Sequence, residues 1–429
     1  MREPKVLEVK DLKVEARGRT ILNHISFSID RGETLLILGR SGSGKTTLLR
    51  ALTFIAKELF DMVIKGSIEI YGEKIHNSYS ASKHIYYIVQ EPWFSISTPY
   101  PYIEIMFYSG NNSQKIINMA KEFGIHNCLW SSTSSLSAGE IERIALLEAY
   151  ISRKDVILID EASSYLDTQS RYKIVKLVKK LKNSGVSTIV VDHDVELWRG
   201  VVDSVLYIDN GSAKIYEDPK ETPIYDDLTK LNEYAEKLSP CSSNEDEIVI
   251  EARDVWFKYP DGERYVINGM DIDIEKGGIT WIKGTSGSGK STLLKILAGI
   301  LKPVKGSIKR PKGIQFIPEN PLYYISSPTP REELMNRIDI AKKFNLERAL
   351  DTPIAMLSSG ERRRLAIASA FIRQPKVLLI DEPTVGLDPW NAMHVLESLC
   401  LLAKHGCGIA VASHGEELRY ISNKVIELG

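Results

Sequence analysis

One stretch of the sequence has residue types and spacing suited to binding a chain of phosphate groups. Gly39 to Thr46 reads GRSGSGKT and fits the pattern G-x-x-x-x-G-K-[ST] at every specified position. The apolar residues 34–38 predict a buried strand before this loop, and the residues from Thr47 onward predict a helix after it. A strand that leads through glycines into a helix aims backbone N–H groups and the positive end of the helix dipole at one point. We expect Lys45 to reach the β- and γ-phosphates of a nucleotide and the Thr46 hydroxyl to coordinate Mg²⁺.

The same stretch recurs in the second half of the chain, where residues 284–291 read GTSGSGKS. Further pairs of matching segments follow both loops: LSAGE and LSSGE, VILIDE and VLLIDE, and a histidine after a later apolar strand. The three pairs are each offset by 221 residues, whereas Lys45 and Lys290 are offset by 245, so the second copy is 24 residues shorter in between. The chain is therefore a duplication.

Composition narrows the possible classes of protein. The 429 residues allow two or three domains, and 55 basic against 56 acidic residues provide no overall positive field to attract nucleic acid. The four cysteines have no C-x-x-C spacing, which argues against a zinc or iron–sulfur site and favours reduced thiols in the cytosol. No secretory signal and no apolar run of about 18 residues is present, so a role at a membrane requires a partner.

Strand-like and helix-like segments alternate through both halves, which predicts parallel sheets with crossover helices. One long helix is expected over residues 48–64 and others over 113–123, 141–151 and 170–182. Residues 218–247 are acidic and contain several prolines, as in EDPKETPIYDDL, which predicts a linker that contains a short helix. The expected domains are 1–217 and 248–429.

This ordered, duplicated set of motifs resembles the nucleotide-binding domain of the ATP-binding-cassette (ABC) ATPases over nearly the whole chain outside the linker. The resemblance implies an α/β fold in each half: a RecA-like, mainly parallel sheet, a small antiparallel β-subdomain and a helical subdomain. It also implies ATP hydrolysis with ATP and Mg²⁺. Within the family, residues 256–262 (WFKYPDG) resemble the energy-coupling-factor ATPases of vitamin and metal-ion importers, in which Tyr259 would stack on adenine.

The resemblance implies that two cassettes pair head to tail, with each ATP held between one phosphate loop and the signature of the facing cassette. Glu161 and Glu382 would then be catalytic bases, and His193 and His414 would contact the γ-phosphate. The magnesium ligands would be Thr46, Gln90, Asp160, Ser291, Glu319 and Asp381. Nucleotide would bind to Gly39, Ser41, Gly42, Gly44, Lys45, Thr46 and Thr47, to Gly284, Ser286, Gly287, Gly289, Lys290, Ser291 and Thr292, to Tyr259, and to the signature residues Ser137, Gly139, Glu140, Ser358, Gly360 and Glu361.

The two halves differ at positions that the resemblance marks as functional. Gln90 in the first copy corresponds to Glu319 in the second, which adds a negative charge near the γ-phosphate. At the adenine-stacking position the second copy has Tyr259, whereas the first has Ala16. We therefore expect two unequal sites. The alternative is that the glutamate is tolerated without consequence.

Aromatic residues follow Gln90 and Glu319 in the sequence: Trp93 and Phe94 in the first copy, Tyr323 and Tyr324 in the second. In ABC transporters this region receives a helix of the membrane protein, and aromatic side chains suit such a docking surface. Packing inside the helical subdomain explains them equally well.

The leading hypothesis is the ATPase subunit of a transporter, an importer of the energy-coupling type, held at the cytoplasmic face of the membrane by an integral membrane partner. No nucleic-acid partner is expected, and the cassettes pair within one chain or with a second copy. The rival hypothesis is a soluble twin-cassette ATPase acting on ribosomes or nucleic acid. A short acidic linker in place of a long charged one, and no cysteine-rich iron–sulfur segment, argue against the rival. The transported molecule is not encoded in an ATPase subunit.

Overall fold

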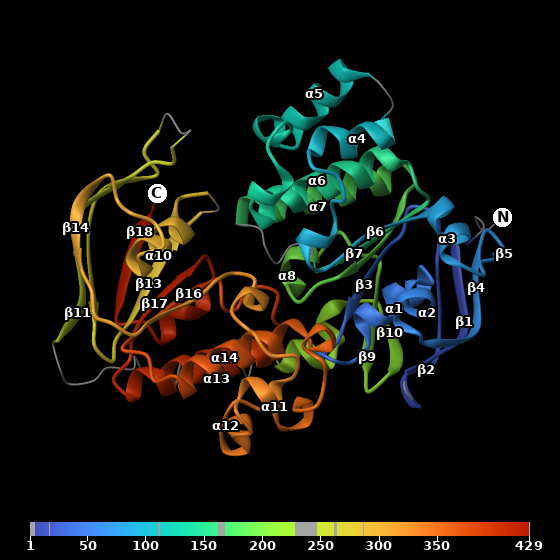
Figure 1. Ribbon diagram of the computed structural model, residues 1–429. Helices are drawn as coiled ribbons and strands as arrows, with labels where there is room; N and C mark the ends of the chain where they lie inside the picture. The colour runs from blue at the N-terminus through green and yellow to red at the C-terminus, as the bar shows by residue number, and fades with distance from the viewer. Residues whose placement is uncertain are drawn as a thin grey trace. The chain divides into compact units, whose positions relative to one another are not determined.

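Strand β3 (Thr34–Leu38) lies at the centre of the first half of the protein, and all five of its residues are buried. The computed structural model describes residues 5–16, 18–109, 112–161, 168–227, 247–260, 264–285 and 287–428 (Figure 1). The chain divides into two units, Met1–Asp227 and Leu228–Gly429. Ser286 of the second phosphate loop and residues 228–246 of the expected linker lie outside the described residues.

The main sheet of the first unit has the strand order β10-β9-β3-β8-β7-β6. Its strands are parallel from β6 to β9, and β10 pairs with β9 in the antiparallel direction. Because parallel strands end at a common edge, the residues that follow β3, β6, β7 and β8 are brought together there. The bounds are β6 Ile85–Ile88, β7 Val156–Asp160, β8 Ser187–Val191, β9 Ser204–Asp209 and β10 Ser212–Tyr216.

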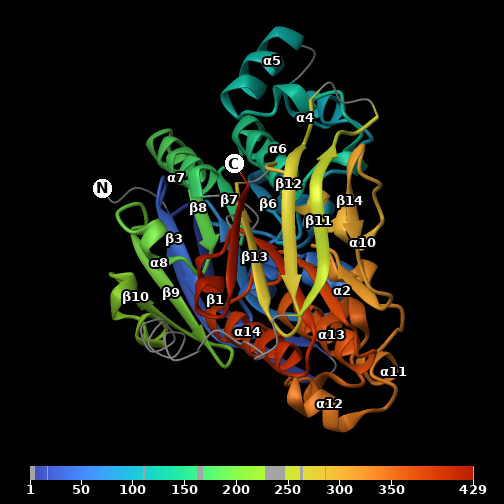
Figure 2. The ribbon, with the colours of Figure 1, turned by 90° about the vertical axis from the view of Figure 1, so that its left-hand side faces the viewer.

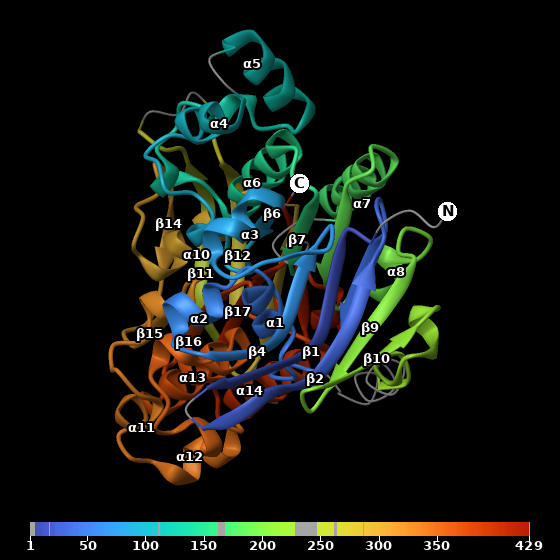
Figure 3. The same ribbon diagram turned by 90° about the vertical axis from the view of Figure 1, so that its right-hand side faces the viewer.

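A second sheet of the first unit is antiparallel, with the order β2-β1-β4-β5. Figure 3 shows β1, β2 and β4 running together beside the parallel strands. Alternating residues of β1 are buried, and they share one apolar core with the phosphate-loop helix and β3. This sheet therefore supports the phosphate loop from one side. The bounds are β1 Leu7–Ala16, β2 Arg19–Ile29, β4 Val63–Ile70 and β5 Glu73–Lys74.

The prediction of one long helix over residues 48–64 is wrong. The structure has α1 (Lys45–Leu52) and α2 (Ile55–Phe60), followed directly by β4. Phe54 stands between the two helices with a φ of 60°, a left-handed conformation that ends the first helix and redirects the chain. The apolar pattern continued across this break because both helices bury residues in the same core.

The remaining helices of the first unit include a separate helical subdomain. In it, α4, α5 and α6 pack around their own apolar core; α4 and α5 lie farthest from the sheets, whereas α6 also contacts β6 (Figures 1 and 3). The helices expected over 113–123, 141–151 and 170–182 are confirmed with small changes of boundary. The bounds are α3 Ser78–His84, η1 Pro92–Phe94, α4 Pro101–Ser109, α5 Ser113–Glu122, η2 His126–Cys128, η3 Thr133–Ser135, α6 Ala138–Ser152, α7 Thr168–Asn183, α8 Val195–Trp198 and η4 Pro219–Glu221.

The second unit repeats this plan. Its parallel sheet has the order β15-β16-β17-β13-β18, which matches β6-β7-β8-β3-β9 strand for strand, and its antiparallel sheet is β12-β11-β14 (Figure 2). The described residues of the second unit form two apolar cores: one contains Leu293 and other residues of the phosphate-loop helix, and the other contains Leu396 and other residues of α14. The strands are β11 Ile248–Phe257, β12 Ile267–Glu275, β13 Ile279–Gly284, β14 Lys305–Lys309, β15 Ile314–Ile317, β16 Val377–Asp381, β17 Gly408–Ser413 and β18 Lys424–Leu428.

The helices of the second unit follow the order of those in the first, except that α2 and α3 have no counterpart among the described residues between α10 and β15. The bounds are α10 Lys290–Ala298, η5 Pro321–Tyr323, α11 Pro330–Glu333, α12 Ile338–Lys343, η6 Glu347–Ala349, η7 Ile354–Met356, α13 Ser359–Ile372, α14 Pro389–Lys404 and η8 Glu416–Tyr420. The α/β fold expected for both halves is confirmed. Across the described ranges, no helix is both long enough and apolar enough to cross a membrane. Cys128, Cys400 and Cys407 are buried thiols outside any disulfide bond, and Cys241 lies outside the described residues.

Candidate functional site

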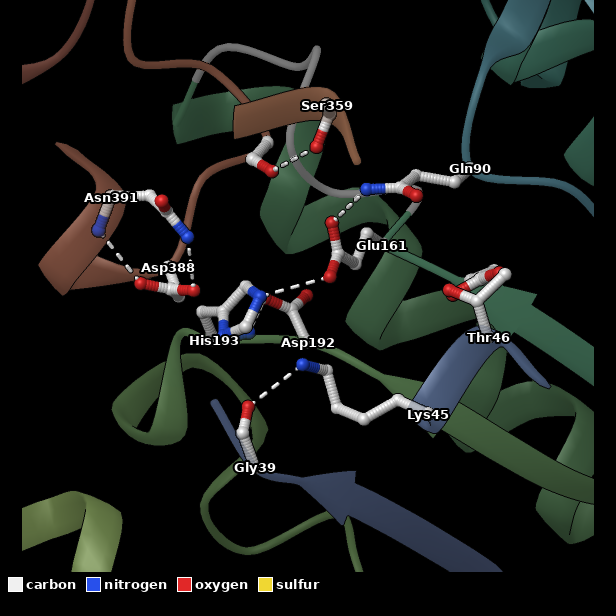
Figure 4. A network of polar contacts seen from close by, with 12 residues as sticks. Gly39, Lys45, Thr46, Gln90, Glu161, Asp192, His193, Ser359, Asp388 and Asn391 are labelled. Carbon is white, nitrogen blue, oxygen red and sulfur yellow. Dashed lines mark hydrogen bonds and ion pairs between the residues drawn. The ribbon is translucent and has the colours of Figure 1, made fainter. Parts of the chain in front are cut away.

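The first phosphate loop joins β3 to α1 and encloses the ammonium group of Lys45. Lys45 is 5% exposed, and its Nζ donates hydrogen bonds to the carbonyl oxygens of Gly39 at 2.7 Å and Arg40 at 3.1 Å (Figure 4). Gly44 begins the helix with a φ of 108°, and a Cβ on Gly39 would lie 2.3 Å from the carbonyl oxygen of Ile208. Glycine is therefore required at both positions. The other predicted residues of this loop and first turn, Ser41, Gly42 and Thr47, lie there as expected.

The second phosphate loop has the same main-chain geometry. Nζ of Lys290 donates to the carbonyl oxygens of Gly284 at 2.8 Å and Thr285 at 3.2 Å. Lys290 also forms an ion pair with Oε1 of Glu382 at 3.5 Å. In both loops the lysine is thus held inside the loop by backbone oxygens that an anionic ligand can replace. The predicted residues Gly287, Gly289, Ser291 and Thr292 lie in this loop and in the first turn of α10.

A pair of oxygen ligands suited to Mg²⁺ lies beside the first loop. The Thr46 hydroxyl donates to Oδ1 of Asp160 at 3.2 Å, and Oδ2 of Asp160 accepts from the Tyr87 hydroxyl at 2.9 Å. Burial, together with the charge of Glu161, raises the pKa of Asp160 to about 6. A divalent cation would relieve this cost of burying a carboxylate, and Mg²⁺ prefers such hard oxygen ligands. The residues present therefore fit the metal that the sequence predicts.

The equivalent carboxylate of the second unit has one oxygen without a partner. Asp381 is 4% exposed, and its Oδ1 is buried with no hydrogen bond. The cause lies on β15, where Phe316 occupies the register position of Tyr87 and has no hydroxyl to donate. Burial and the charge of Glu382 raise the pKa of Asp381 to about 6, and a hydrogen bond from Ser291 opposes them. An unpartnered buried acceptor beside Ser291 fits Mg²⁺ at this position too.

The predicted base of the first unit, Glu161, has both carboxylate oxygens engaged. Oε2 accepts from the Gln90 side chain at 2.5 Å, and Oε1 lies 2.9 Å from Nε2 of His193 (Figure 4). Glu161 follows the last residue of β7 with a φ of 54°, while its N–H still bonds to the carbonyl oxygen of Val191 at 2.9 Å. A left-handed glutamate held by its neighbours is the kind of local strain found at functional sites. The structure brings these three predicted residues together.

The second unit holds Glu382 in the same backbone conformation, with a φ of 45°, but with different partners. Oε1 lies 3.0 Å from Nδ1 of His414, and Oε2 accepts from the Ser413 hydroxyl at 2.9 Å. Burial favours protonation of Glu382, but the hydrogen bond and charge of His414 and the charge of Lys290 hold its pKa below the ordinary value. The carboxylate is therefore kept ionised.

Glu319 is the strongest difference between the two units. Burial raises its pKa to about 8, and the charges of Asp381 and Glu382 act in the same direction. In the first unit the corresponding Gln90 instead donates a hydrogen bond to Glu161, the predicted base. With its pKa at about 8, the Glu319 carboxyl group is mostly protonated and uncharged at pH 7, so the negative charge expected from the sequence is present only at more alkaline pH. Near neutral pH the two sites therefore differ in their hydrogen-bonding groups, a carboxylic acid in place of an amide, rather than in charge.

Each signature motif begins a helix through a capping box. The Ser137 N–H donates to Oε2 of Glu140 at 2.9 Å, and the amide of Glu140 donates to the Ser137 hydroxyl oxygen at 3.4 Å. The corresponding distances for Ser358 and Glu361 are 2.8 and 3.3 Å. The glutamates thus fix the first turns of α6 and α13, so that the helix N-termini are ordered for an anion. The predicted glycines of the two signatures, Gly139 and Gly360, are buried in these turns.

The expected adenine-stacking residue of the second unit is partly fixed in place. Tyr259 is 42% exposed, its hydroxyl lies 3.0 Å from Oγ1 of Thr292, and its ring meets the edge of Phe257 at 5.0 Å between centroids. It is therefore anchored to the helix that follows the phosphate loop. Ala16 ends β1 in the first unit and supplies no ring.

The aromatic residues after the Gln90 and Glu319 positions divide between surface and interior. Phe94 and Tyr323, which correspond to one another in η1 and η5, are 69% and 82% exposed. Tyr324 instead packs on the core, donates to Oε1 of Gln315 at 2.9 Å and lies under the guanidinium of Arg373. Each unit thus presents one large aromatic side chain to solvent at the same place.

Three residues with roles in these networks were not predicted from the sequence. Tyr87 and Ser413 bond directly to the predicted metal ligand and base of their units. Asp192 accepts from the backbone of His193 at 2.6 Å and from Nε1 of Trp198 at 2.8 Å, which fixes the turn that carries the histidine. A comparison of the two copies position by position, Tyr87 against Phe316 and Asp192 against Ser413, carries the only signal for them.

Comparison with known proteins agrees with this geometry. A family model described as ABC transporter matches residues 22–164 and 267–385. A protein of Sulfurisphaera tokodaii named "Putative ABC transporter ATP-binding protein" is 30% identical, and the match covers 92% of this chain and 90% of that protein.

Two solved structures share the twin-cassette fold. One, described as a model of ribosome-bound archaeal Pelota and ABCE1, has a TM-score of 0.69 at 21% identity and covers 97% of this chain and 76% of that one. The other, described as RNase-L Inhibitor, has a TM-score of 0.62 at 20% identity and covers 97% of this chain and 87% of that one. At these identities the likeness establishes the fold.

Proposed function

Because the chain belongs to the ABC transporter family, we propose that its two units supply two composite sites for ATP hydrolysis. The chain is an ATPase by that membership. In each site the phosphate loop and glutamate of one cassette face the signature helix of another, from the same chain or a second copy. We propose nucleotide-binding domains at 1–217 and 248–429 and a linker at 218–247, of which residues 218–227 belong to the first compact unit.

The observation that carries this proposal is that Glu161 after β7 and Glu382 after β16 both have a left-handed backbone conformation. In the first site, Gln90 and His193 orient the carboxylate of Glu161. That carboxylate holds the attacking water and takes its proton at an Oε atom. Lys45 moves from the backbone carbonyls to the γ-phosphate, and the first turn of the facing signature helix donates N–H groups to it. Bound Mg²⁺, held by Thr46 and Asp160, would neutralise charge on the β- and γ-oxygens.

The first candidate for the coupled process is transport. Phe94 and Tyr323 present solvent-exposed aromatic rings at equivalent places in the two units, next to Gln90 and Glu319. A helix of an integral membrane protein that docks on such a ring would move with the neighbouring Gln90 or Glu319, the predicted magnesium ligands. The name of the Sulfurisphaera relative supports this candidate. In its finer form the chain is an energy-coupling-factor importer ATPase held at the cytoplasmic face of the membrane.

The second candidate is a ribosome-associated ATPase, and two observations favour it. One of the solved structures with this fold is described as ribosome-bound. In addition, α7 exposes Lys173, Lys176 and Lys179 along one face, whereas the corresponding helix α14 contains a single lysine, Lys404, at its end. A row of lysines three residues apart on a helix surface suits the phosphate backbone of RNA. This surface does not depend on the aromatic residues.

The two candidates are separated by capturing the tagged full-length chain from cells, both from detergent extracts of membranes and from ribosome pellets, in the presence of ATP. Transport predicts recovery of a polytopic membrane protein, and loss of it in a Phe94→Ser/Tyr323→Ser variant. The ribosomal candidate predicts co-sedimentation with ribosomal subunits that a Lys173→Glu/Lys176→Glu/Lys179→Glu variant abolishes. Tyr79→Ser is the matched control, since that ring is 73% exposed elsewhere on the first unit. Recovery of ribosomal subunits without any membrane protein would overturn the transport candidate.

A further inference from the structure

An ion pair connects the first phosphate loop with the last residue of the first unit. Nε and Nη2 of Arg40 both lie close to Oδ2 of Asp227, at 3.1 and 2.5 Å. The Asp227 side chain is 17% exposed and that of Arg40 is 54% exposed. An arginine that uses two nitrogens on one carboxylate is fixed in orientation as well as in position.

Asp227 is itself held in place by the segment that precedes it. Asp218 caps η4 by accepting from the amide of Lys220 at 2.9 Å, and the Thr222 hydroxyl donates to the carbonyl oxygen of Pro219 at 2.6 Å. Thr222 and Ile224 are 1% and 3% exposed, and residues 223–227 are helical. The carboxylate is therefore presented from a packed turn and helix.

The backbone of Arg40 contacts Lys45, the predicted phosphate-binding residue of the loop. Its carbonyl oxygen accepts from Nζ of Lys45 at 3.1 Å, so a single residue connects Asp227 with the lysine. When Lys45 moves to a phosphate, the loop loses this internal hydrogen bond, and the side-chain contact with Asp227 remains to hold its shape. A loop that keeps its shape binds the nucleotide without the cost of ordering it.

The second loop provides the natural comparison. Thr285 stands at the position of Arg40, and its carbonyl oxygen accepts from Lys290 at 3.2 Å, as in the first loop. Threonine has no charge to pair with a carboxylate. The side-chain contact is therefore a property of the first site, while the main-chain geometry is common to both.

We propose that Asp227 is a positioning residue for nucleotide binding at the first site, acting through Arg40. The inference rests on the proposed role of Gly39 to Thr46 in binding nucleotide. Loss of the pair weakens the affinity of the first site for Mg·ADP and Mg·ATP and leaves the second site unchanged. Because Asp227 belongs to the packed segment 219–227 and pairs with Arg40 of the loop, nucleotide binding at the first site also stabilises this segment.

The test measures Mg·ADP binding to the full-length chain by calorimetry, in a Lys290→Ala background that closes the second site. Asp227→Asn is expected to lower the affinity of the first site roughly 3- to 10-fold, the range for one partly exposed, well-oriented ion pair. Asp209→Asn is the matched control, because Asp209 is an exposed carboxylate whose charge also acts on Arg40 without pairing with it. Its affinity is expected to stay within 2-fold of the parent.

Two further variants keep the result independent of folding. Arg40→Thr, which copies the second loop, is expected to lower the affinity as much as Asp227→Asn, and the double variant no further, because both remove the same contact. Asp227→Glu is expected to restore most of the affinity with an unchanged melting temperature. Additive losses, or an Asp227→Asn affinity equal to that of the parent, overturn the inference.

Lys45→Ala in the same background separates this inference from the proposed function. If Lys45→Ala leaves Mg·ADP binding unchanged, the role of the phosphate loop itself is wrong. If Lys45→Ala abolishes binding while Asp227→Asn has no effect, only the positioning role of Asp227 fails. A measured 3- to 10-fold loss in Asp227→Asn together with abolition in Lys45→Ala supports both.

Discussion

Replacing Glu148 by glutamine is expected to make the protein more stable at alkaline pH. Glu148 lies on α6, is 1% exposed, and accepts from the Tyr86 hydroxyl at 2.8 Å through Oε2, while Oε1 has no hydrogen-bond partner. Burial raises its pKa to about 8, and the charge of Glu104 acts in the same direction. The corresponding position in the second unit is Ser369, whose hydroxyl donates to the buried carboxylate of Glu333 at 2.6 Å. Serine there adds no carboxylate to Glu333, whereas in the first unit Glu148 is buried in addition to Glu104.

The sign and size follow from proton linkage. Below an ordinary pKa of 4.5 both the folded and unfolded states carry the proton on Glu148, and the carboxyl group costs nothing. Between pH 4.5 and 8 only the folded state keeps it, so the free energy of unfolding falls by about 1.4 kcal/mol per pH unit. Water penetration and relaxation reduce the total, and we expect Glu148→Gln to gain about 2–4 kcal/mol over the parent at pH 8.5.

The assay is urea unfolding followed by tryptophan fluorescence at half-unit steps from pH 5 to 9. The midpoint of the parent is expected to fall with rising pH relative to that of Glu148→Gln, and the two curves converge near pH 5. Glu122→Gln is the control, because Glu122 is 58% exposed in the same subdomain and pairs with Lys180 at the surface. A Glu148→Gln difference that is independent of pH, or a parent that gains stability toward pH 8, would refute the reasoning.

Three further outcomes follow from the geometry of the sites. Gly39→Ala is expected to abolish nucleotide binding at the first site, because the added Cβ would lie 2.3 Å from the carbonyl oxygen of Ile208. Nucleotide titration in a Lys290→Ala background measures this binding, and retained binding would contradict the prediction. Tyr259→Ala is expected to raise the KM for ATP about 5-fold with little change in kcat, as loss of one stacking ring does, and steady-state kinetics check it. Single Glu161→Gln and Glu382→Gln variants are expected to leave unequal residual turnover in phosphate-release assays, and indistinguishable rates would show that the two sites are equivalent.

The expected helix over residues 48–64 illustrates where sequence reasoning met its limit. Apolar residues on both sides of Phe54 pack in one core, so periodicity alone could not reveal that Phe54 turns the chain at a left-handed φ. The aromatic pairs after Gln90 and Glu319 show the same limit. The sequence left docking and packing equally open, and the structure separates the exposed Phe94 and Tyr323 from the packed Tyr324.

The sequence by itself determined the duplication, the two phosphate loops and the order of the motifs, because these rest on short local patterns that one backbone geometry requires. Through the family resemblance it also predicted which residues are the metal ligands and bases, and these lie near one another because residues at the ends of neighbouring parallel strands meet at one edge. Only the tertiary structure decided which side chains support them. Tyr87 on Asp160, Ser413 on Glu382 and Asp227 on Arg40 are contacts between residues 31 to 187 positions apart in the chain. No local sequence pattern predicts such contacts, because they arise when the strands and the 219–227 segment pack around the phosphate loop.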